Sequence, residues 1–182
     1  PYISYGSVKY RVTRIASSAF ASLSNVRFIK IPDTVISIGD NAFEGTAWYG
    51  NLPNGIIYVN NVLYRYKGDM PANTNVVISE GIISISPNAF EYCDNLTSVV
   101  IPKTVTHIGM GAFSMCTSLK DVVIPDSVTS LDYAAFANTK WFNDLPDGLV
   151  YINNVLYTYK GSKKINPTIV INEGVVSITS HA

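Results

Sequence analysis

Residues 96–116 read LTSVVIPKTVTHIGMGAFSMC, and residues 119–136 read LKDVVIPDSVTSLDYAAF. The two segments share one pattern, in which each apolar anchor recurs 23 residues later. A fixed period of about 20 to 50 residues is typical of solenoids, in which each repeat forms one coil. No single coil can bury its apolar residues alone. The sequence therefore predicts stacked coils that share one continuous core.

One repeat contains the parts of one coil. Val99 and Ile101 alternate with period two, so both side chains should point to the same face of a short strand. Pro102 has no N–H to donate to a neighbouring strand, and it therefore ends the strand. Val105 and Ile108 indicate a short extended or irregular second side. The Ala-Phe pair that follows closes the coil, because the ring is large and alanine allows close approach of the backbone.

The Ala-Phe pair marks the register of five coils, and its phenylalanines are Phe20, Phe43, Phe90, Phe113 and Phe136. Twelve residues before each ring comes the apolar residue of the strand: Val8, Ile31, Ile78, Ile101 and Ile124, with Ile171 in the same frame. We expect one solenoid domain over residues 1–182, mainly β or α/β. It should be a right-handed superhelix of about six coils with a parallel sheet on one face. Helix should be scarce, with at most a short turn before each Ala-Phe pair. Both ends interrupt a coil, so we expect a fragment of a longer protein.

Two coils carry an insertion of 24 residues each, at about residues 45–75 and 138–168. The second insertion repeats the first 93 residues further on. Each contains an Asn-Asn pair between β-branched and aromatic runs, which is typical of a two-residue hairpin turn. The sequence predicts a β-hairpin in each insertion. Val59 should face Val62 in the first, and Ile152 should face Val155 in the second.

This pattern resembles the bacterial leucine-rich repeats of the BspA-like, or Treponema pallidum, type. The resemblance rests on the Ile-Pro, Val-x-x-Ile and Ala-Phe-x-x-Cys marks of a 23-residue repeat. It implies a curved solenoid in an exported or surface-attached protein that acts in adhesion or protein binding. The cysteine of the mark is Leu23, Thr46 and Thr139 in three coils, so we interpret it as a packing position.

Composition excludes several classes of protein. The chain has 13 basic and 13 acidic residues and a formal net charge of zero, whereas a nucleic-acid-binding domain should carry a basic patch. No apolar run approaches the roughly 18–20 residues that a membrane span needs. The motifs of nucleotide-binding loops and of serine hydrolases are missing. We therefore expect no enzyme, no cofactor and no nucleic-acid partner.

Cysteine and histidine are the remaining reactive residues. Cys93 and Cys116 hold the same position of adjacent coils, where a disulfide is sterically conceivable but two buried thiols fit the pattern better. His107 and His181 have no ligand spacing to the cysteines, so a metal site is improbable. His107 replaces a serine of the repeat, and the simplest interpretation is a surface substitution.

Two surfaces are candidates for binding. On the strands, the side chains that point away from the core should line a concave sheet that could hold a partner, and they include Ser98, Val100, Asp121 and Val123. The alternative is an ordinary solvated sheet. On the hairpins, aromatic residues recur in matching positions: Tyr58, Tyr64 and Tyr66, then Tyr151, Tyr157 and Tyr159. These rings could bind a protein or stack on a sugar, or they could fasten the hairpins to the solenoid. Packing is favoured for Trp48 and Trp141.

The sequence thus predicts a non-enzymatic binding module of an extracellular or cell-surface protein. Its partner would be a protein, for example of a host extracellular matrix. A carbohydrate-binding module and a structural spacer are the alternatives. Exposure of the tyrosines separates the binding hypotheses from the spacer.

Overall fold

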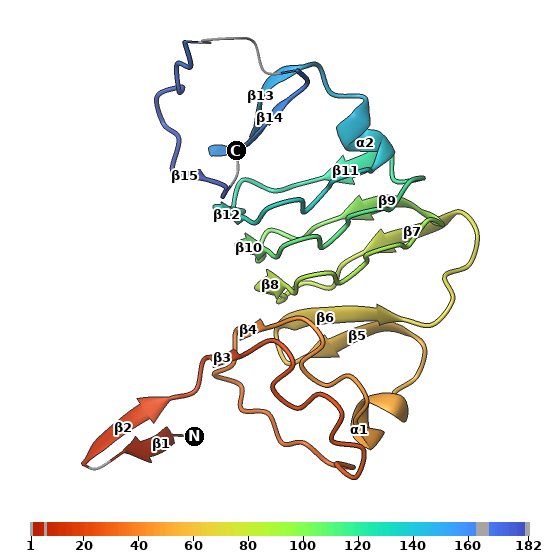
Figure 1. The fold of residues 1–182 in the computed structure, drawn as a ribbon, viewed down its shortest axis with the longest axis vertical. Coiled ribbons are helices and arrows are strands. Elements are labelled where there is room, and N and C mark those ends of the chain that lie inside the picture. Colours follow the sequence, from red (N-terminus) through yellow and green to blue (C-terminus); the bar gives the residue numbers. More distant parts are fainter. Residues whose placement is uncertain (1, 6, 163–167, 181–182) are drawn as a thin grey trace.

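The computed structural model describes residues 2–5, 7–162 and 168–180, with side chains described for residue 7 and, within these ranges, from residue 9 onward. The end of the second predicted insertion, at residues 163–167, lies outside this description. The chain forms a mainly β solenoid of about seven turns with a spacing of about 23 residues (Figure 1). This confirms the predicted fold class.

The longer parallel sheet has the strand order β11-β9-β7. Its strands are β7 (Thr74–Val77), β9 (Leu96–Val100) and β11 (Asp121–Val123). Val76, Val99 and Val122 are in register across the three strands. Val99 is fully buried and its neighbour Val100 is exposed, as the period-two alternation predicts. Each strand ends one or two residues before the position of Pro102 or its equivalent.

A second parallel ladder runs along the opposite part of each coil, where the sequence indicated only an extended or irregular segment. Its short strands are β8 (Ser84–Ile85), β10 (His107–Ile108) and β12 (Ser130–Leu131). His107 pairs in register with Ser84 on one side and Ser130 on the other. The second residue of each strand, isoleucine or leucine, points into the core. Two residues per coil suffice for a ladder because the coils already lie in register.

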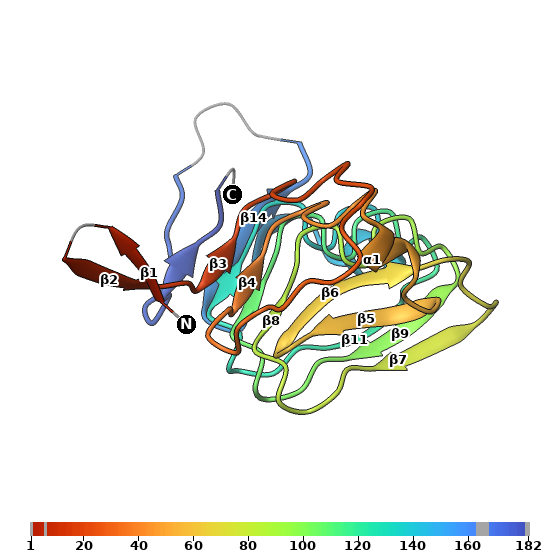
Figure 2. The same cartoon turned by 90° about the horizontal axis from the view of Figure 1, so that it is seen from below.

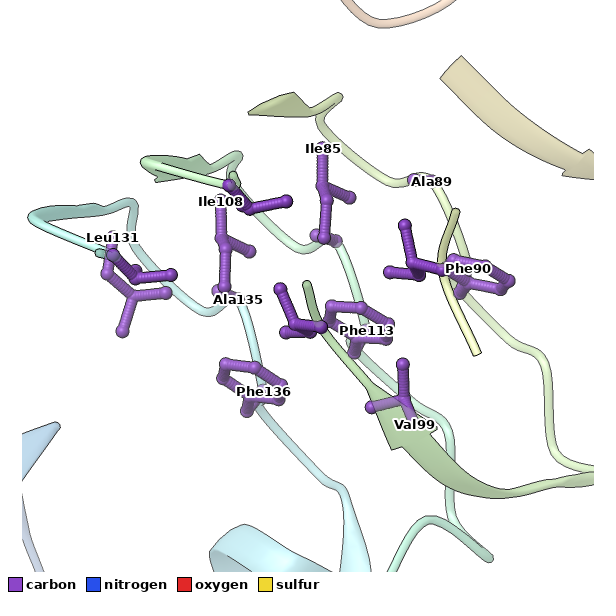
Figure 3. Packing of buried hydrophobic residues seen from close by; sticks show 14 of the residues in the cluster. Ile85, Ala89, Phe90, Val99, Ile108, Phe113, Leu131, Ala135 and Phe136 are labelled. Atoms are coloured by element: carbon purple, nitrogen blue, oxygen red, sulfur yellow. The ribbon is translucent and has the colours of Figure 1, made fainter. Parts of the chain in front are cut away.

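The Ala-Phe pairs form the centre of the core (Figure 3). The rings of Phe90 and Phe113 are stacked with their centres 5.3 Å apart, and those of Phe113 and Phe136 are 5.1 Å apart. The amide N–H of Phe90 donates to the carbonyl of Ala112 at 2.7 Å, and Phe113 donates to Ala135 in the same way. Ala112 and Ala135 are fully buried, since a larger side chain would separate the coils. Of the five predicted phenylalanines, four are fully buried and Phe20 is half-buried.

Both predicted hairpins are present. The first joins β5 (Gly55–Val59) to β6 (Val62–Lys67), and the second joins β13 (Gly148–Ile152) to β14 (Val155–Lys160). Val59 faces Val62 and Ile152 faces Val155, as predicted. Asn60 and Asn153 adopt the positive φ that the turn needs, at 51° and 52°. Their amide groups also donate to the carbonyls of Pro32 and Pro125, which ties each turn to the solenoid.

The hairpins are layers of the stack and not appendages on its flank. β6 pairs in parallel with β8, and β14 pairs with β15 (Ser177–Ile178). Val62 and Tyr64 belong to the hydrophobic core before the first hairpin, whereas Leu63 belongs to the core after it. One face of the first hairpin therefore covers the core before it, and the other face covers the core after it. The hairpin separates the solenoid into blocks.

A tyrosine hydroxyl completes the hydrogen bonding at each hairpin. The N–H of Phe43 has no following Ala-Phe coil to donate to, and it donates to the Tyr64 hydroxyl at 3.2 Å. Phe136 and Tyr157 repeat this bond at 2.9 Å. Both tyrosines are buried, with 1% and 3% of their surface exposed. The two rings therefore pack inside the solenoid, and this part of the structure favours the fastening interpretation of the hairpin aromatics.

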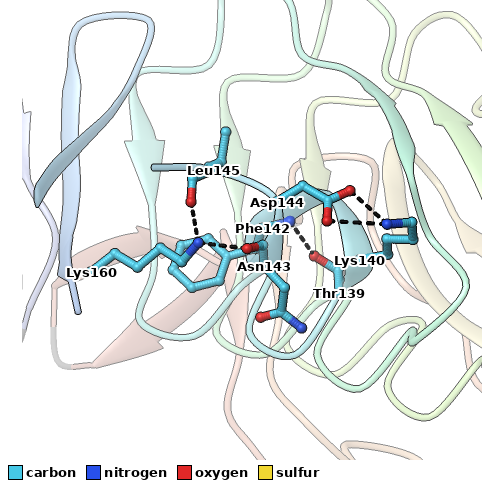
Figure 4. A network of polar contacts seen from close by, with 7 residues as sticks. All are labelled: Thr139, Lys140, Phe142, Asn143, Asp144, Leu145 and Lys160. Atoms are coloured by element: carbon cyan, nitrogen blue, oxygen red, sulfur yellow. Dashed lines mark hydrogen bonds and ion pairs between the residues drawn. The ribbon is translucent and has the colours of Figure 1, made fainter. Parts of the chain in front are cut away.

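A short helix precedes each hairpin. The helices are α1 (Ala47–Gly50) and α2 (Lys140–Asn143), and helix is scarce in the described residues, as predicted. The expected short turn precedes the Ala-Phe pairs, and the two helices follow Phe43 and Phe136. The hydroxyl of Thr139 accepts the N–H of Phe142 at the start of α2. At its end, the Lys160 ammonium group donates to the carbonyls of Asn143 and Leu145 (Figure 4). Lys67 does the same for α1. The end of the hairpin is thereby attached to the helix.

The N-terminal segment differs from the prediction at Val8. This residue was placed in the strand of a first coil, but β1 (Tyr2–Tyr5) and β2 (Val8–Arg11) form an antiparallel pair that projects from the solenoid (Figure 1 and Figure 2). The short ladder begins with β3 (Arg14–Ile15) and β4 (Ser37–Ile38). The residues that follow Val8 do not supply a buried strand, since Lys9, Tyr10 and Arg11 are exposed.

The two cysteines are free thiols. Cys116 is fully buried and its Sγ donates to the Phe90 carbonyl at 3.0 Å, while Cys93 is half-buried. Burial, and secondarily the charge of Asp94, raises the pKa of Cys93 to about 11. Burial also raises the pKa of Cys116. Both thiols are therefore core groups and not reactive ones.

The tyrosine bond can be tested by Tyr64→Phe and Tyr157→Phe. Each change removes the acceptor of a buried N–H, which should lower the free energy of unfolding by about 1–3 kcal/mol. Urea denaturation followed by circular dichroism measures the loss. Tyr58→Phe is the matched control, because the Tyr58 hydroxyl is 3.4 Å from the Ser79 N–H at an exposed position. Equal effects of all three changes would contradict this role.

The same tyrosines should make stability depend on alkaline pH. Burial raises the pKa of Tyr64 and Tyr157 to about 12 in the folded protein, although the N–H that each hydroxyl accepts lowers it. The unfolded value is about 10. Because the folded pKa is the higher one, their contribution is complete below pH 10 and is lost as the pH rises through 12. Urea midpoints at pH 8 and pH 11 should therefore differ more for the parent protein than for Tyr64→Phe or Tyr157→Phe.

The raised thiol pKa values predict slow thiol chemistry. At pH 8 both cysteines are protonated and mostly covered, so a thiol-disulfide reagent such as Ellman's reagent should react with neither in the folded protein. Two thiols should react once urea is added. Rapid labelling of Cys116 in the folded state would show that the core opens at this coil.

Candidate functional site

A groove of about 770 Å³ runs across the coils along the short ladder. Its lining includes residues of β3, β4, β8, β10 and β12. The first residue of each of these strands contributes to the lining: Arg14, Ser37, Ser84, His107 and Ser130. These residues hold one position of the repeat, and the ladder register places them in a row.

At the groove, the coils on the two sides of the first hairpin come into contact. Val62 holds the same position of the ladder as Ser84, yet it is fully buried and does not line the groove. Above it, the Ser84 hydroxyl donates to the Ile36 carbonyl at 2.6 Å, which joins β8 to the segment before β4. The coils before and after the hairpin thus meet over β6. The second hairpin repeats this contact, since the Ser177 hydroxyl donates to the Thr129 carbonyl at 2.8 Å.

The lining of the groove is mixed, with apolar residues such as Ile36 and Ile83 beside polar ones. Six of the residues are hydroxylic: Thr13, Ser17, Ser37, Ser84, Thr106 and Ser130. The Nδ1 of His107 lies 3.0 Å from the Ser130 hydroxyl, and its Nε2 lies 3.5 Å from a carboxylate oxygen of Asp132. Arg14 stands in the coil at the far end of the row. The groove therefore offers donors, acceptors and both signs of charge.

Serine, histidine and aspartate in contact can also mean nucleophilic catalysis, which needs donors for the developing oxyanion. Here the N–H groups of Ser130 and Asp132 already donate to the carbonyls of Thr106 and Ile108. His107 and Asp132 are one-third and nearly one-half exposed. This cluster is better suited to hydrogen bonding with a bound partner than to acyl transfer.

The residues predicted on a concave sheet lie elsewhere. Ser98 and Val100 are on β9, Asp121 and Val123 are on β11, and none of them lines the groove. Val100, Asp121 and Val123 are exposed, so they remain available for contact. Ser98 donates to the side-chain oxygen of Asn75 at 2.6 Å. The groove lies on the other ladder, where the coils before and after the first hairpin meet through Ser84 and Ile36.

The predicted hairpin tyrosines do not form one site. Tyr64 and Tyr157 are buried. The hydroxyls of Tyr58 and Tyr151 accept the N–H groups of Ser79 and Asn172, at 3.4 and 3.3 Å. The last pair is half-buried: Tyr66 packs on the ring of Phe90, with centres 6.1 Å apart, and Tyr159 lines a small pocket.

Sequence reasoning missed the groove, although a signal for it existed. The position that lines the groove is serine in most coils, with Arg14 and His107 as the exceptions. A row of small polar residues at one ladder position marks a surface with room above it. In the described residues, no group of three or more His, Cys, Asp or Glu could hold a metal ion.

The described helices have four residues each, and none is long and apolar enough to cross a bilayer. No curated protein matches the sequence. Three solved structures are similar to the chain. A leucine-rich repeat protein of T. pallidum is 29% identical, with 42% of this chain and 37% of that chain covered and a TM-score of 0.38. A leucine-rich cell surface protein of Faecalibacterium prausnitzii A2-165 is 26% identical, with 76% and 38% covered and a TM-score of 0.32.

The third is a leucine-rich repeat protein of Bacteroides ovatus ATCC 8483, 21% identical, with 99% and 58% covered and a TM-score of 0.40. The chain thus spans between 37% and 58% of the length of these proteins. The family described as "BspA type Leucine rich repeat region" matches in six copies, over residues 3–68 and 83–182. Together with the 23-residue coils and their Ala-Phe core, this match shows that the chain belongs to the BspA-type leucine-rich repeat family.

Proposed function

We propose that the chain is a non-enzymatic protein-binding module of a secreted or cell-surface protein. The observation that supports this most is the groove along the short ladder, which is lined by polar side chains from five strands. Arg14 and Ser130 are exposed, Ser37 and His107 are half-buried, and Ser84 is buried. Repeat proteins bind partners through such extended concave surfaces. The family and the cell surface protein among the similar structures support a location outside the cell.

The partner that suits this groove is a polypeptide segment with polar side chains. Ser37, His107 and Ser130 offer hydrogen-bond donors and acceptors, while Arg14 and Asp132 can pair with charges of either sign. No phenylalanine, tyrosine or tryptophan is present among the described residues that line the groove, so it offers no large flat ring for stacking on a sugar. A protein of the host extracellular matrix is the specific partner that we propose, and adhesion is the role.

A screen of this chain against extracellular matrix proteins and a glycan array, run side by side, tests the proposal. Ser37→Arg and Ser130→Arg place a long side chain in the groove and should weaken binding of the protein partner by about tenfold or more, which is about 1.4 kcal/mol. Val100→Arg and Val123→Arg are matched controls, because they add the same side chain to the exposed face of the other sheet. These controls should bind as the parent does.

Three results would contradict the proposal. Binding that survives the groove changes but is lost in the Val100 and Val123 variants would move the site to the longer sheet. Hits only on the glycan array would favour a carbohydrate-binding module. No binding to either the matrix proteins or the glycan array would favour a structural spacer.

A further inference from the structure

The second hairpin carries a pocket of about 280 Å³ that is separate from the groove. Its walls come from three segments: the loop that contains Tyr133 and Ala134, helix α2 with Phe142, and the end of β14 with Tyr157–Gly161. The rings of Phe142 and Tyr157 meet edge to face with their centres 5.8 Å apart. The pocket is therefore lined mainly by aromatic rings.

The first hairpin shows what occupies the corresponding place in the same chain. There, Arg65 extends from β6 and its guanidinium group forms a close ion pair with Asp40 and a 3.1 Å hydrogen bond to the Asn41 side chain. Asp40 and Arg65 are both mostly covered. The Arg65 side chain thus lies between the first hairpin and the loop that precedes it.

All three members of this contact are replaced 93 residues further on. Thr158 stands in place of Arg65, Tyr133 in place of Asp40, and Ala134 in place of Asn41. The long side chain is shortened, and the groups that bound its charge become an aromatic ring and a methyl group. The surrounding frame is kept, since Phe142 and Lys160 correspond to Tyr49 and Lys67. Among the described residues, no side chain fills the place that corresponds to that of Arg65, and the pocket lies there.

Charge limits what the pocket can bind. No carboxylate is present among its described lining residues, whereas the Lys160 ammonium group lies 5.7 Å from the centre of the Phe142 ring. A second cation would be repelled by Lys160 and would find no counter-charge. At the first hairpin, Lys67 is 5.3 Å from the Tyr49 ring, but Asp40 compensates the charge of Arg65.

We infer that this pocket binds one uncharged aliphatic or aromatic side chain of a partner polypeptide. Pockets that bury such an anchor contribute most of the binding energy at many protein interfaces. Edge-to-face contacts with Phe142 and Tyr157 would add to the burial of an aromatic anchor. The site is a second contact point beside the groove, and it does not depend on what the groove binds.

Small probes test the pocket without knowledge of the partner. The ¹⁵N-labelled chain is titrated with N-acetyl-tryptophanamide, N-acetyl-leucinamide, N-acetyl-argininamide and methyl β-glucopyranoside, and amide shifts are followed by NMR. The tryptophan or leucine probe should shift the amides of Phe142, Thr158 and their neighbours. The arginine and sugar probes should leave them unchanged.

The first hairpin provides the design of the control variant. The triple change Tyr133→Asp, Ala134→Asn and Thr158→Arg transfers the Arg65 contact to the second hairpin and should abolish the probe shifts. Because it copies an arrangement that the chain already contains, folding should be retained, and circular dichroism checks this. Thr158→Met is a second filling variant that brings no charge into the pocket. Ser37→Arg, which blocks the groove, should leave the probe shifts intact.

Each other result overturns the inference. Shifts with only the sugar would assign the pocket to a glycan, and shifts with only the arginine probe would assign it to a cation. Shifts that persist in both filled variants would place the probes elsewhere, and no shift with any probe up to its solubility limit would show that the pocket binds none of these classes. Failure of the groove proposal appears separately, as partner binding that Ser37→Arg does not weaken.

Discussion

One hydrogen bond, repeated from coil to coil, sets the spacing of the whole solenoid. Phe20, Phe90 and Phe113 each donate their amide N–H to the carbonyl of the alanine before the next phenylalanine. This bond keeps the coils close enough for the rings to stack at 5.1 to 5.3 Å in the central coils. A buried N–H without an acceptor is costly, so any coil that departs from the pattern must supply a substitute acceptor.

The hairpins depart from the pattern and supply that acceptor from a side chain. The hydroxyls of Tyr64 and Tyr157 take the place of the missing alanine carbonyl. This substitution lets a flat two-stranded layer enter the stack and cover a core on each face. A solenoid of uniform coils would bend evenly. Here the coils meet over the hairpin strand through Ser84 and Ile36, and the groove follows from that contact.

The two hairpin insertions, which repeat 93 residues apart, also show how one structural framework can hold different side chains. Both hairpins keep the helix, the capping threonine and the lysine that holds the helix end. Within this frame, the first hairpin closes a gap with the Arg65–Asp40 ion pair, while the second leaves a pocket lined by aromatic rings. The shared helix, threonine and lysine stabilise both hairpins, so the residues inside the gap are free to differ.

The sequence by itself determined the repeat, the strand that ends before Pro102, the Ala-Phe core and the two hairpins with their facing β-branched residues. These features can be read locally, because each depends on the repeat period, on a proline or on an asparagine, and not on contacts between distant segments. It could not give the second ladder, since a two-residue strand exists only when neighbouring coils are already in register. It placed Tyr64 and Tyr157 among the possible contact residues, because the spacing of a ring does not tell which face of a hairpin will be covered. Only the tertiary structure decided that the hairpins are layers of the core. It also placed the candidate groove on the short ladder, because the groove results from contacts between segments 48 residues apart.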